Sequence, residues 1–224
     1  DQGFVHTLTE TDFSDPWELG TPDDQVCHSG EQCWVTRLDG EYDNCEAGGL
    51  YSAEIDLSPC SGSDQRVTLS AWHLYRMEDE TDGHWYDAAL IQVSADGGST
   101  WQDVSPTPGY TATIEGNYSE CAGTPEVDGH PGWSGWIADN DWREVVVELG
   151  DELRTETFRV AFQLASDRGV TDARWYIDDV PSQAARSSER IRPTAPSPAP
   201  GTGSSSRSTP QLYHAPRSSD LHVP

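Results

Sequence analysis

Acidic side chains supply the clearest potential chemistry in this sequence. Asp178 and Asp179 follow the apolar residues WYI, and Asp87 follows Trp85 and Tyr86 at the start of another apolar segment. Successive strand residues point to opposite faces, so one carboxylate of the Asp pair can project into a given site. Carboxylate oxygens are ligands that Ca²⁺ prefers. We therefore expect a structural calcium site at these three aspartates, the alternative being aspartates that hydrogen-bond loops.

Aromatic residues suggest a second kind of site. Trp133 and Trp136 lie in the segment GWSGW, within a long loop between Gly109 and Asp141 that also contains Tyr118. Flat aromatic faces suit the rings of sugars. If these three side chains are exposed on one patch, the chain is a carbohydrate-binding module. If they pack in the core, they are structural, as we expect for most of the nine Trp residues.

The segment SADGGSTW at residues 94–101 has the SxDxGxTW pattern of the Asp-boxes in sialidases. Such a box fixes a hairpin turn and does no chemistry, because Asp96 and the glycines after it set the turn while Trp101 plugs the core beneath. A sialidase propeller needs several copies, whereas this chain has one. We therefore predict a structural hairpin tip.

No set of residues predicts catalysis. GWSGW has Trp136 where a nucleophile elbow requires Gly. The sequence has no HExxH or CxxC motif, and its seven His residues lack the spacing of metal ligands. Among 39 acidic residues, a pair at glycosidase distance can arise by chance. We expect no enzyme activity from this chain.

The cysteines indicate an oxidising compartment. Cys27, Cys33, Cys45 and Cys60 crowd the first third of the chain, and Cys121 stands apart. We expect one or two local disulfides, pairing Cys27 with Cys33 and Cys45 with Cys60, with Cys121 either unpaired or bonded to a partner outside this sequence. The alternative is a set of reduced, partly buried thiols.

The charge balance excludes several kinds of partner. All 13 basic residues are Arg, and with 39 acidic residues they leave a net charge of -26. Such a surface repels phosphate backbones and anionic lipid, so we expect neither nucleic-acid binding nor membrane insertion. The first ten residues lack the basic and apolar stretches of a signal peptide. We therefore expect a mature or excised form of a secreted or cell-surface protein.

Short strands dominate the first 180 residues. The segment RVTLSAWHLYR at 66–76 alternates apolar and polar side chains. Comparable segments, rich in β-branched and aromatic residues, occupy 85–104, 143–150, 158–167 and 174–180. No segment keeps a helical apolar period over three turns. The sequence therefore predicts an all-β fold, an antiparallel two-sheet jelly-roll sandwich.

The composition changes after Val180. Residues 181–224 are rich in Pro, Ser and Ala and contain five Arg and two acidic residues, whereas residues 1–180 contain eight Arg and 37 acidic residues. So little apolar surface cannot offset the entropy of ordering. We predict a β-sandwich domain at 1–180 followed by a disordered tail at 181–224, either a linker or the product of a shifted reading frame.

A set of blocks resembles a known family. The blocks are PWELGTP (16–22), CHSGEQCWVTRLDGEY (27–42), LYSAEIDLS (50–58), WYDAALIQVSADGGSTW (85–101) and RWYIDDV (174–180). Together they resemble the MAM-like jelly-roll module that accompanies immune inhibitor A-type metallopeptidases and other bacterial secreted and cell-surface proteins. The resemblance implies a β-sandwich without an active site, often with a structural calcium to which Asp87, Asp178 and Asp179 contribute. The aromatic-Glu pair that usually precedes the module is absent here.

One expectation and two alternatives follow. We expect a non-catalytic accessory or adhesion module, stabilised by Ca²⁺, from a secreted or cell-surface bacterial protein. Its partners would be the other domains of the parent protein and a polysaccharide or cell-surface protein. The first alternative is a carbohydrate-binding module that uses Tyr118, Trp133 and Trp136. The second is the C-terminal fragment of a secreted metallopeptidase that lacks its catalytic domain.

Overall fold

The computed structural model describes residues 3–8, 14–116, 118–121, 125, 127–180 and 185–186. All of them belong to one compact unit. The predicted tail at 181–224 lies outside the described residues, except for a short strand at 185–186. Its disorder therefore stays a prediction.

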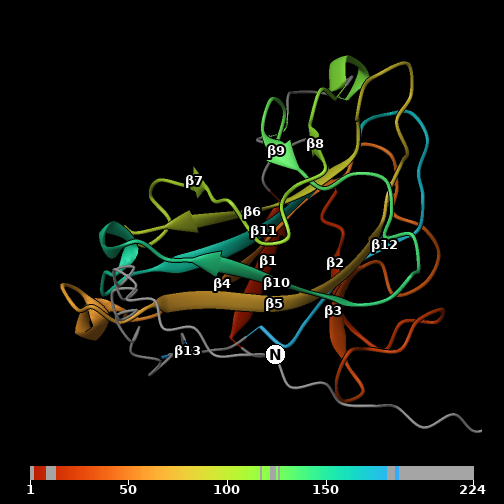
Figure 1. Ribbon diagram of the computed structural model, residues 1–224. Coiled ribbons are helices and arrows are strands. Elements are labelled where there is room, and N and C mark those ends of the chain that lie inside the picture. Colours follow the sequence, from red (N-terminus) through yellow and green to blue (C-terminus); the bar gives the residue numbers. More distant parts are fainter. Residues whose placement is uncertain are drawn as a thin grey trace, which may run out of the picture. The chain divides into compact units, whose positions relative to one another are not determined.

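Two antiparallel sheets form a sandwich (Figure 1). The first sheet has the order β1 (Phe4–Leu8), β4 (Ala47–Ser52), β11 (Arg159–Ala165), β6 (Ala88–Ser94) and β7 (Gln102–Asp103). The second has the order β10 (Arg143–Glu148), β5 (Val67–Arg76), β12 (Arg174–Asp178), β3 (Cys33–Thr36) and β2 (Trp17–Gly20), and β13 (Ala185–Arg186) also pairs with β5. The predicted all-β sandwich of two antiparallel sheets is confirmed.

The remaining elements are short. Strands β8 (Ala112–Thr113) and β9 (Pro131–Gly132) form a separate two-stranded ribbon. The helical turns in the described part of the chain are the 3-10 helices η1 (Ser58–Cys60), η2 (Tyr118–Glu120) and η3 (Asp151–Leu153). None of the helices among these residues has the length and apolar character needed to cross a membrane.

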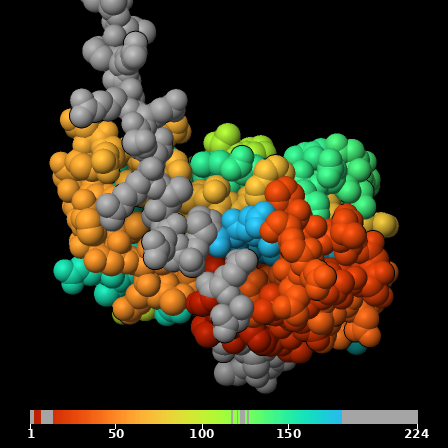
Figure 2. Space-filling view, turned by 90° about the horizontal axis from the view of Figure 1, so that it is seen from below, coloured from red at the N-terminus to blue at the C-terminus, as the bar shows by residue number. Residues whose placement is uncertain are grey.

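Alternating side chains build the central core between the sheets. Leu69 and Ala71 on β5 face Phe162 and Leu164 on β11 across the sandwich, and Trp175 on β12 fills the middle at 0% exposure. Phe162 and Trp175 pack edge to face, with ring centroids 5.9 Å apart. In Figure 2 the blue segment of β12 lies between the orange β5 region and the red-orange N-terminal residues, in agreement with its place between β5 and β3.

Long loops cover the outer face of each sheet. On the first sheet, Leu90 packs under a loop that contributes Ile114, Tyr118 and Val127. On the second sheet, a separate cluster of buried residues contains Cys33, Val35, Leu74, Trp142 and Tyr176. Because both faces are partly covered, several strands do not show the simple alternation of a half-exposed sheet.

The hairpin between β6 and β7 confirms the structural interpretation of SADGGSTW. Asp96 accepts hydrogen bonds from the backbone N–H and the hydroxyl of Thr100, at 2.8 and 2.7 Å. Gly97 and Gly98 adopt φ of 75° and 94°, a left-handed conformation that favours glycine. Trp101 does not plug the core, however. It is half-buried and packs on the ring of Tyr51 at 5.3 Å.

The disulfides differ in part from the prediction. Cys27 pairs with Cys33, as expected. The predicted pairing of Cys45 with Cys60 is wrong, because Cys45 pairs with Cys121 and Cys60 is a buried free thiol. The loop that covers the first sheet brings Cys121 back to Cys45 across 76 residues of chain. Spacing along the sequence could not reveal this return.

Candidate metal centre

Three buried carboxylates from distant parts of the chain meet at one end of the sandwich. Glu78, Asp87 and Asp167 each offer a ligand oxygen within 4.8 Å of the others. Their side chains are nearly enclosed, with residue exposures of 5%, 1% and 5%. Charged carboxylates are almost never fully buried without a cation or ion-pair partner. The arrangement therefore has the donor chemistry of a metal site.

Strand ends position the three residues. Glu78 follows β5, Asp87 precedes β6, and Asp167 follows β11, so a strand of the second sheet and two of the first contribute one carboxylate each. The Asp167 backbone N–H donates to Asp87 Oδ1 at 2.8 Å. Ser134 donates to the carbonyl oxygens of Asp87 and Glu78, at 2.5 and 3.2 Å. The serine of GWSGW thus supports the backbone of the site.

Hydrogen bonding leaves one carboxylate oxygen unused. Asp87 Oδ2 accepts a 2.5 Å bond from the Tyr42 hydroxyl, which itself accepts from the Glu78 N–H at 3.1 Å. Glu78 Oε2 is buried and has no partner among the described residues. A buried acceptor without a donor is costly, and a cation in the cluster would remove that cost.

The pKa values of the clustered carboxyl groups also favour a bound cation. Burial, and then the charge of Asp167, raise the pKa of Glu78 to about 7. Burial is also the main cause of a pKa of Asp87 well above its usual value. Two negative charges within 4.8 Å of each other repel by at least about 3 kcal/mol at an effective dielectric constant of about 20. A divalent cation would offset both burial and repulsion.

The ligand set fits a hard cation. All three side chains donate oxygen, which suits Ca²⁺ or Mg²⁺ and not metals that prefer sulfur or nitrogen ligands. Ca²⁺ accepts carboxylates in either monodentate or bidentate mode and tolerates irregular geometry. The cluster therefore fits the predicted calcium better than it fits a transition metal.

Of the three aspartates predicted as ligands, Asp87 lies in the acidic cluster, whereas Asp178 and Asp179 have other partners. Asp178 Oδ2 accepts from the Ser29 N–H at 2.8 Å. Asp179 accepts from the Ser29 hydroxyl at 2.6 Å and bonds His28 Nδ1 at 2.6 Å. The two aspartates hold the segment closed by the Cys27–Cys33 disulfide, with the His28 ring stacked on Trp72 at 3.8 Å. These hydrogen bonds match the alternative interpretation, in which the two aspartates fix a loop.

The predicted aromatic patch does not form. Tyr118 is 3% exposed and donates to the Tyr86 carbonyl at 2.8 Å. Trp133 is 2% exposed, donates to the Gly109 carbonyl and packs on His73 at 4.5 Å. Only Trp136 of the three is exposed, at 51%. A platform of three aromatic faces is therefore wrong, because two of the rings belong to the cores.

The sequence contained a signal for the two residues of the acidic cluster that were missed. Asp167 ends the apolar segment FRVAFQLASD, and Glu78 comes two residues after β5. Both residues are carboxylates at the end of a strand, as Asp178 is, so the reasoning that selected Asp178 applies equally to them. Only the order of strands in the sheets decides which of these ends meet, and the sequence does not provide that order.

The fold and the carboxylate cluster define a class, an antiparallel β-sandwich domain with a buried acidic centre and two disulfides. No family model matches the chain, so the MAM-like resemblance stays a prediction. Bacillopeptidase F of Bacillus subtilis (strain 168) is 25% identical over 166 residues, which are 73% of this chain and 9% of that protein. The chain thus resembles a small part of a much longer protein.

Solved structures are also similar to this chain, and one of them is an adhesin domain. The K2 cleaved adhesin domain of Lys-gingipain superposes with a TM-score of 0.43 and 16% sequence identity, over 80% of this chain and 87% of that chain.

Proposed function

We propose that this chain is a non-catalytic accessory or adhesion module of a larger secreted or cell-surface protein, stabilised by Ca²⁺. The buried cluster of Glu78, Asp87 and Asp167 is the observation that carries this proposal. The two disulfides support an oxidising compartment. The partial similarity to Bacillopeptidase F supports a place beside the other domains of a parent protein.

Calcium would act as a cross-link between the sheets. It would join the end of β5 in one sheet to the ends of β6 and β11 in the other. The ion would neutralise three carboxylates that are costly to bury together and would bind the unpartnered Glu78 Oε2. Since the unfolded chain cannot gather these ligands, binding would add to the stability of the fold.

Burial also supports the non-catalytic interpretation. A pair of carboxylates that hydrolyses a glycosidic or peptide bond must be accessible to its substrate. Glu78, Asp87 and Asp167 are at most 5% exposed, and Tyr42 beside them is 1% exposed. A polymer cannot reach these side chains unless the end of the sandwich opens.

The experiment is thermal unfolding of the whole chain with excess Ca²⁺ and with a chelator. A hundredfold excess over the dissociation constant stabilises the folded state by about 2.7 kcal/mol, which raises the Tm of a domain of this size by roughly 5 to 10 °C. Glu78→Gln should abolish the shift because it replaces a ligand charge with an isosteric amide. Glu80→Gln, on an exposed residue two positions away, should retain it.

Two results would contradict the proposal. If Ca²⁺ leaves the Tm unchanged, the cluster is a protonated hydrogen-bonded group and not a calcium site. If the isolated chain hydrolyses casein or a polysaccharide, and Glu78→Gln abolishes that activity, the module is an enzyme.

A further inference from the structure

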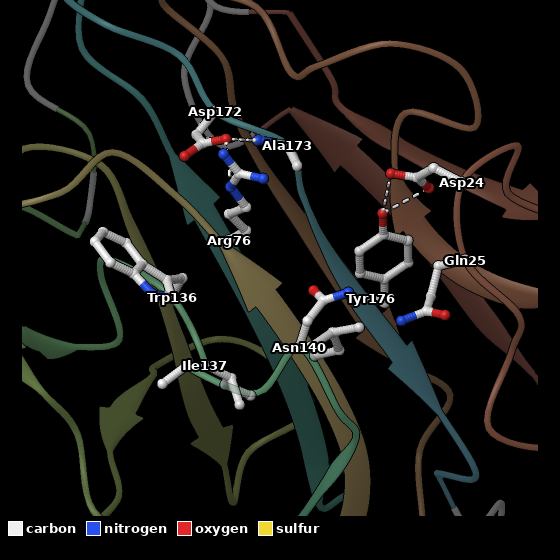
Figure 3. Close-up of a pocket in the computed structure, with 11 residues that line it drawn as sticks. Asp24, Gln25, Arg76, Trp136, Ile137, Asn140, Asp172, Ala173 and Tyr176 are labelled. Atoms are coloured by element: carbon white, nitrogen blue, oxygen red, sulfur yellow. Dashed lines mark hydrogen bonds and ion pairs between the residues drawn. The ribbon is translucent and has the colours of Figure 1, made fainter.

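A pocket on the outer face of the second sheet has no role in the calcium proposal and uses none of its three carboxylates. Its volume is about 480 Å³, within the range of roughly 300–1,000 Å³ that small-molecule sites occupy. Its lining contains Leu74 and Arg76 from β5, Tyr176 from β12, Asp24 and Gln25, and, from the loop before β10, Trp136, Ile137, Ala138 and Asn140 (Figure 3). Asp172 and Ala173 complete it.

The pocket is built on rigid elements. Leu74 and Tyr176 are paired partners on adjacent strands, and both belong to the buried cluster on this face. Tyr176 donates to the carboxylate of Asp24, with oxygen distances of 2.9 and 3.0 Å. Arg174, 3% exposed in its side chain, forms ion pairs with Asp24 and with Asp23, the latter at 2.6 Å. These contacts fix the wall that carries Asp24 and Gln25.

The opposite wall carries an exposed indole. Trp136 is 51% exposed, whereas each of the other eight Trp residues is buried or half-buried. Its backbone pairs with Arg76, which keeps the ring beside the pocket. Figure 3 shows Trp136 on one side and Tyr176 with Asp24 on the other. An indole face presented to a polar cavity is a surface on which a ring with C–H groups can stack.

Polar groups with unused hydrogen-bonding capacity surround this indole. Asp172 uses Oδ1 to accept from Arg76 Nε at 2.9 Å and from the Ala173 N–H at 2.8 Å, and its Oδ2 has no partner among the described residues. The Asn140 amide and the indole N–H of Trp136 make no side-chain hydrogen bond to any described residue. The pocket thus offers both donors and acceptors next to one aromatic face.

The charged residues around the pocket, and the net charge of the chain, indicate which kind of ligand the pocket can bind. Within the lining, Arg76 pairs with Asp172, while Arg174 beneath the wall is shared between Asp24 and Asp23, so the pocket and its wall carry no excess positive charge that would attract an anion. The chain as a whole has a net charge of -26, which disfavours acidic polymers. A molecule with an apolar ring face and many hydroxyls, and without charge, matches this surface best.

We propose that this pocket binds a neutral saccharide, with a pyranose ring stacked on Trp136 and its hydroxyls bonded to Asn140, Asp172 and Arg76. Trp136 is a member of the aromatic set that the sequence suggested, but its partners in binding are polar residues: Asn140 from its own loop, Arg76 from β5 and Asp172 from the segment before β12. The ligand would be a segment of a polysaccharide, because the pocket is a surface depression from which a chain can extend.

Isothermal titration calorimetry of the whole chain tests this inference. The probes are the neutral oligosaccharides cellohexaose, xylohexaose, mannohexaose and chitohexaose, with an oligogalacturonate as the acidic comparison. We expect a neutral probe to bind and the acidic one not to. Trp136→Ala should weaken binding at least about tenfold, and Asn140→Ala should weaken it less. Trp101→Ala is the matched control, because it removes a half-buried indole from the other sheet.

Each outcome of these titrations either supports or overturns the proposed saccharide site. Binding of a neutral probe that Trp136→Ala weakens and Trp101→Ala preserves supports the site. Absence of binding by all four neutral probes overturns it, as does binding that Trp136→Ala leaves unchanged. Because Trp136 is exposed, its replacement should not change the Tm, and an unchanged Tm separates lost contact from lost fold. A chain that binds Ca²⁺ and none of the sugars would leave the calcium proposal intact and overturn this one.

Discussion

Removal of the Cys45–Cys121 disulfide should lower the free energy of unfolding more than removal of the Cys27–Cys33 disulfide. The two bonds close loops of 76 and 6 residues. The chain-entropy relation gives about 4.5 kcal/mol for the longer loop and about 2 kcal/mol for the shorter. The predicted pairing of Cys45 with Cys60 would have closed 15 residues and contributed about 3 kcal/mol.

Local contacts add to the larger loss. The Cys45 N–H donates to the Asp167 carbonyl at 2.7 Å, next to the acidic cluster. Cys121 is 5% exposed and packs in the cluster that covers the first sheet. Loss of the cross-link therefore also loosens the cover of the first sheet.

The assay is denaturant unfolding of two double variants, Cys45→Ala/Cys121→Ala and Cys27→Ala/Cys33→Ala, in the presence of a chelator. The chelator prevents metal binding from hiding the difference. Non-reducing peptide mapping should recover the peptides of Cys45 and Cys121 joined. Equal losses in the two variants, or a Cys45–Cys60 peptide in the unmodified chain, would refute the reasoning.

Two further predictions concern a buried histidine and a loop-fixing aspartate. Burial, and then the charge of Arg143, lower the pKa of His73 to about 4. Between pH 6.5 and 4 the unfolded state binds the extra proton, so stability should fall by about 3 kcal/mol as the pH decreases through this range. Urea unfolding across this range should show a smaller fall in His73→Gln, and an equal fall would contradict the assignment. Asp178→Ala leaves the Ser29 N–H without its acceptor and should cost about 1–3 kcal/mol. The Tm of this variant should still rise when Ca²⁺ is added. If the rise is lost, Asp178 is a calcium ligand.

The sequence was sufficient for the strands and for part of the acidic centre. Apolar and polar side chains alternate along residues 66–76 because one face of this strand lies in the central core. The sequence therefore predicted both β5 and the residues that point inward from it. Asp87 could be identified because it begins an apolar strand. Its partners could not, because Glu78 and Asp167 meet it only through the pairing of β11 with β6 and the stacking of the two sheets.

Long loops account for the other errors. Trp133 and Trp136 are three residues apart in one turn-rich segment, yet their exposures are 2% and 51%. Trp133 extends into the central core beside β6, where its backbone pairs with Ala89, while Trp136 pairs with Arg76 at the rim. Local sequence gives no indication of which of two neighbouring indoles turns inward. The partner of Cys45 was missed for the same reason.

The covered outer faces also determine where this protein can tolerate substitution. Every residue of β6 and of β12 is buried, because loops lie over the face that an open sandwich would expose to water. Strand β10 alternates buried with half-buried or exposed residues. A polar replacement that β10 accepts at Glu144 would be rejected at nearly any position of β6. We therefore expect substitutions to be tolerated on the outer face of β10 and in the loops and their rims, and Trp136 stands on such a rim.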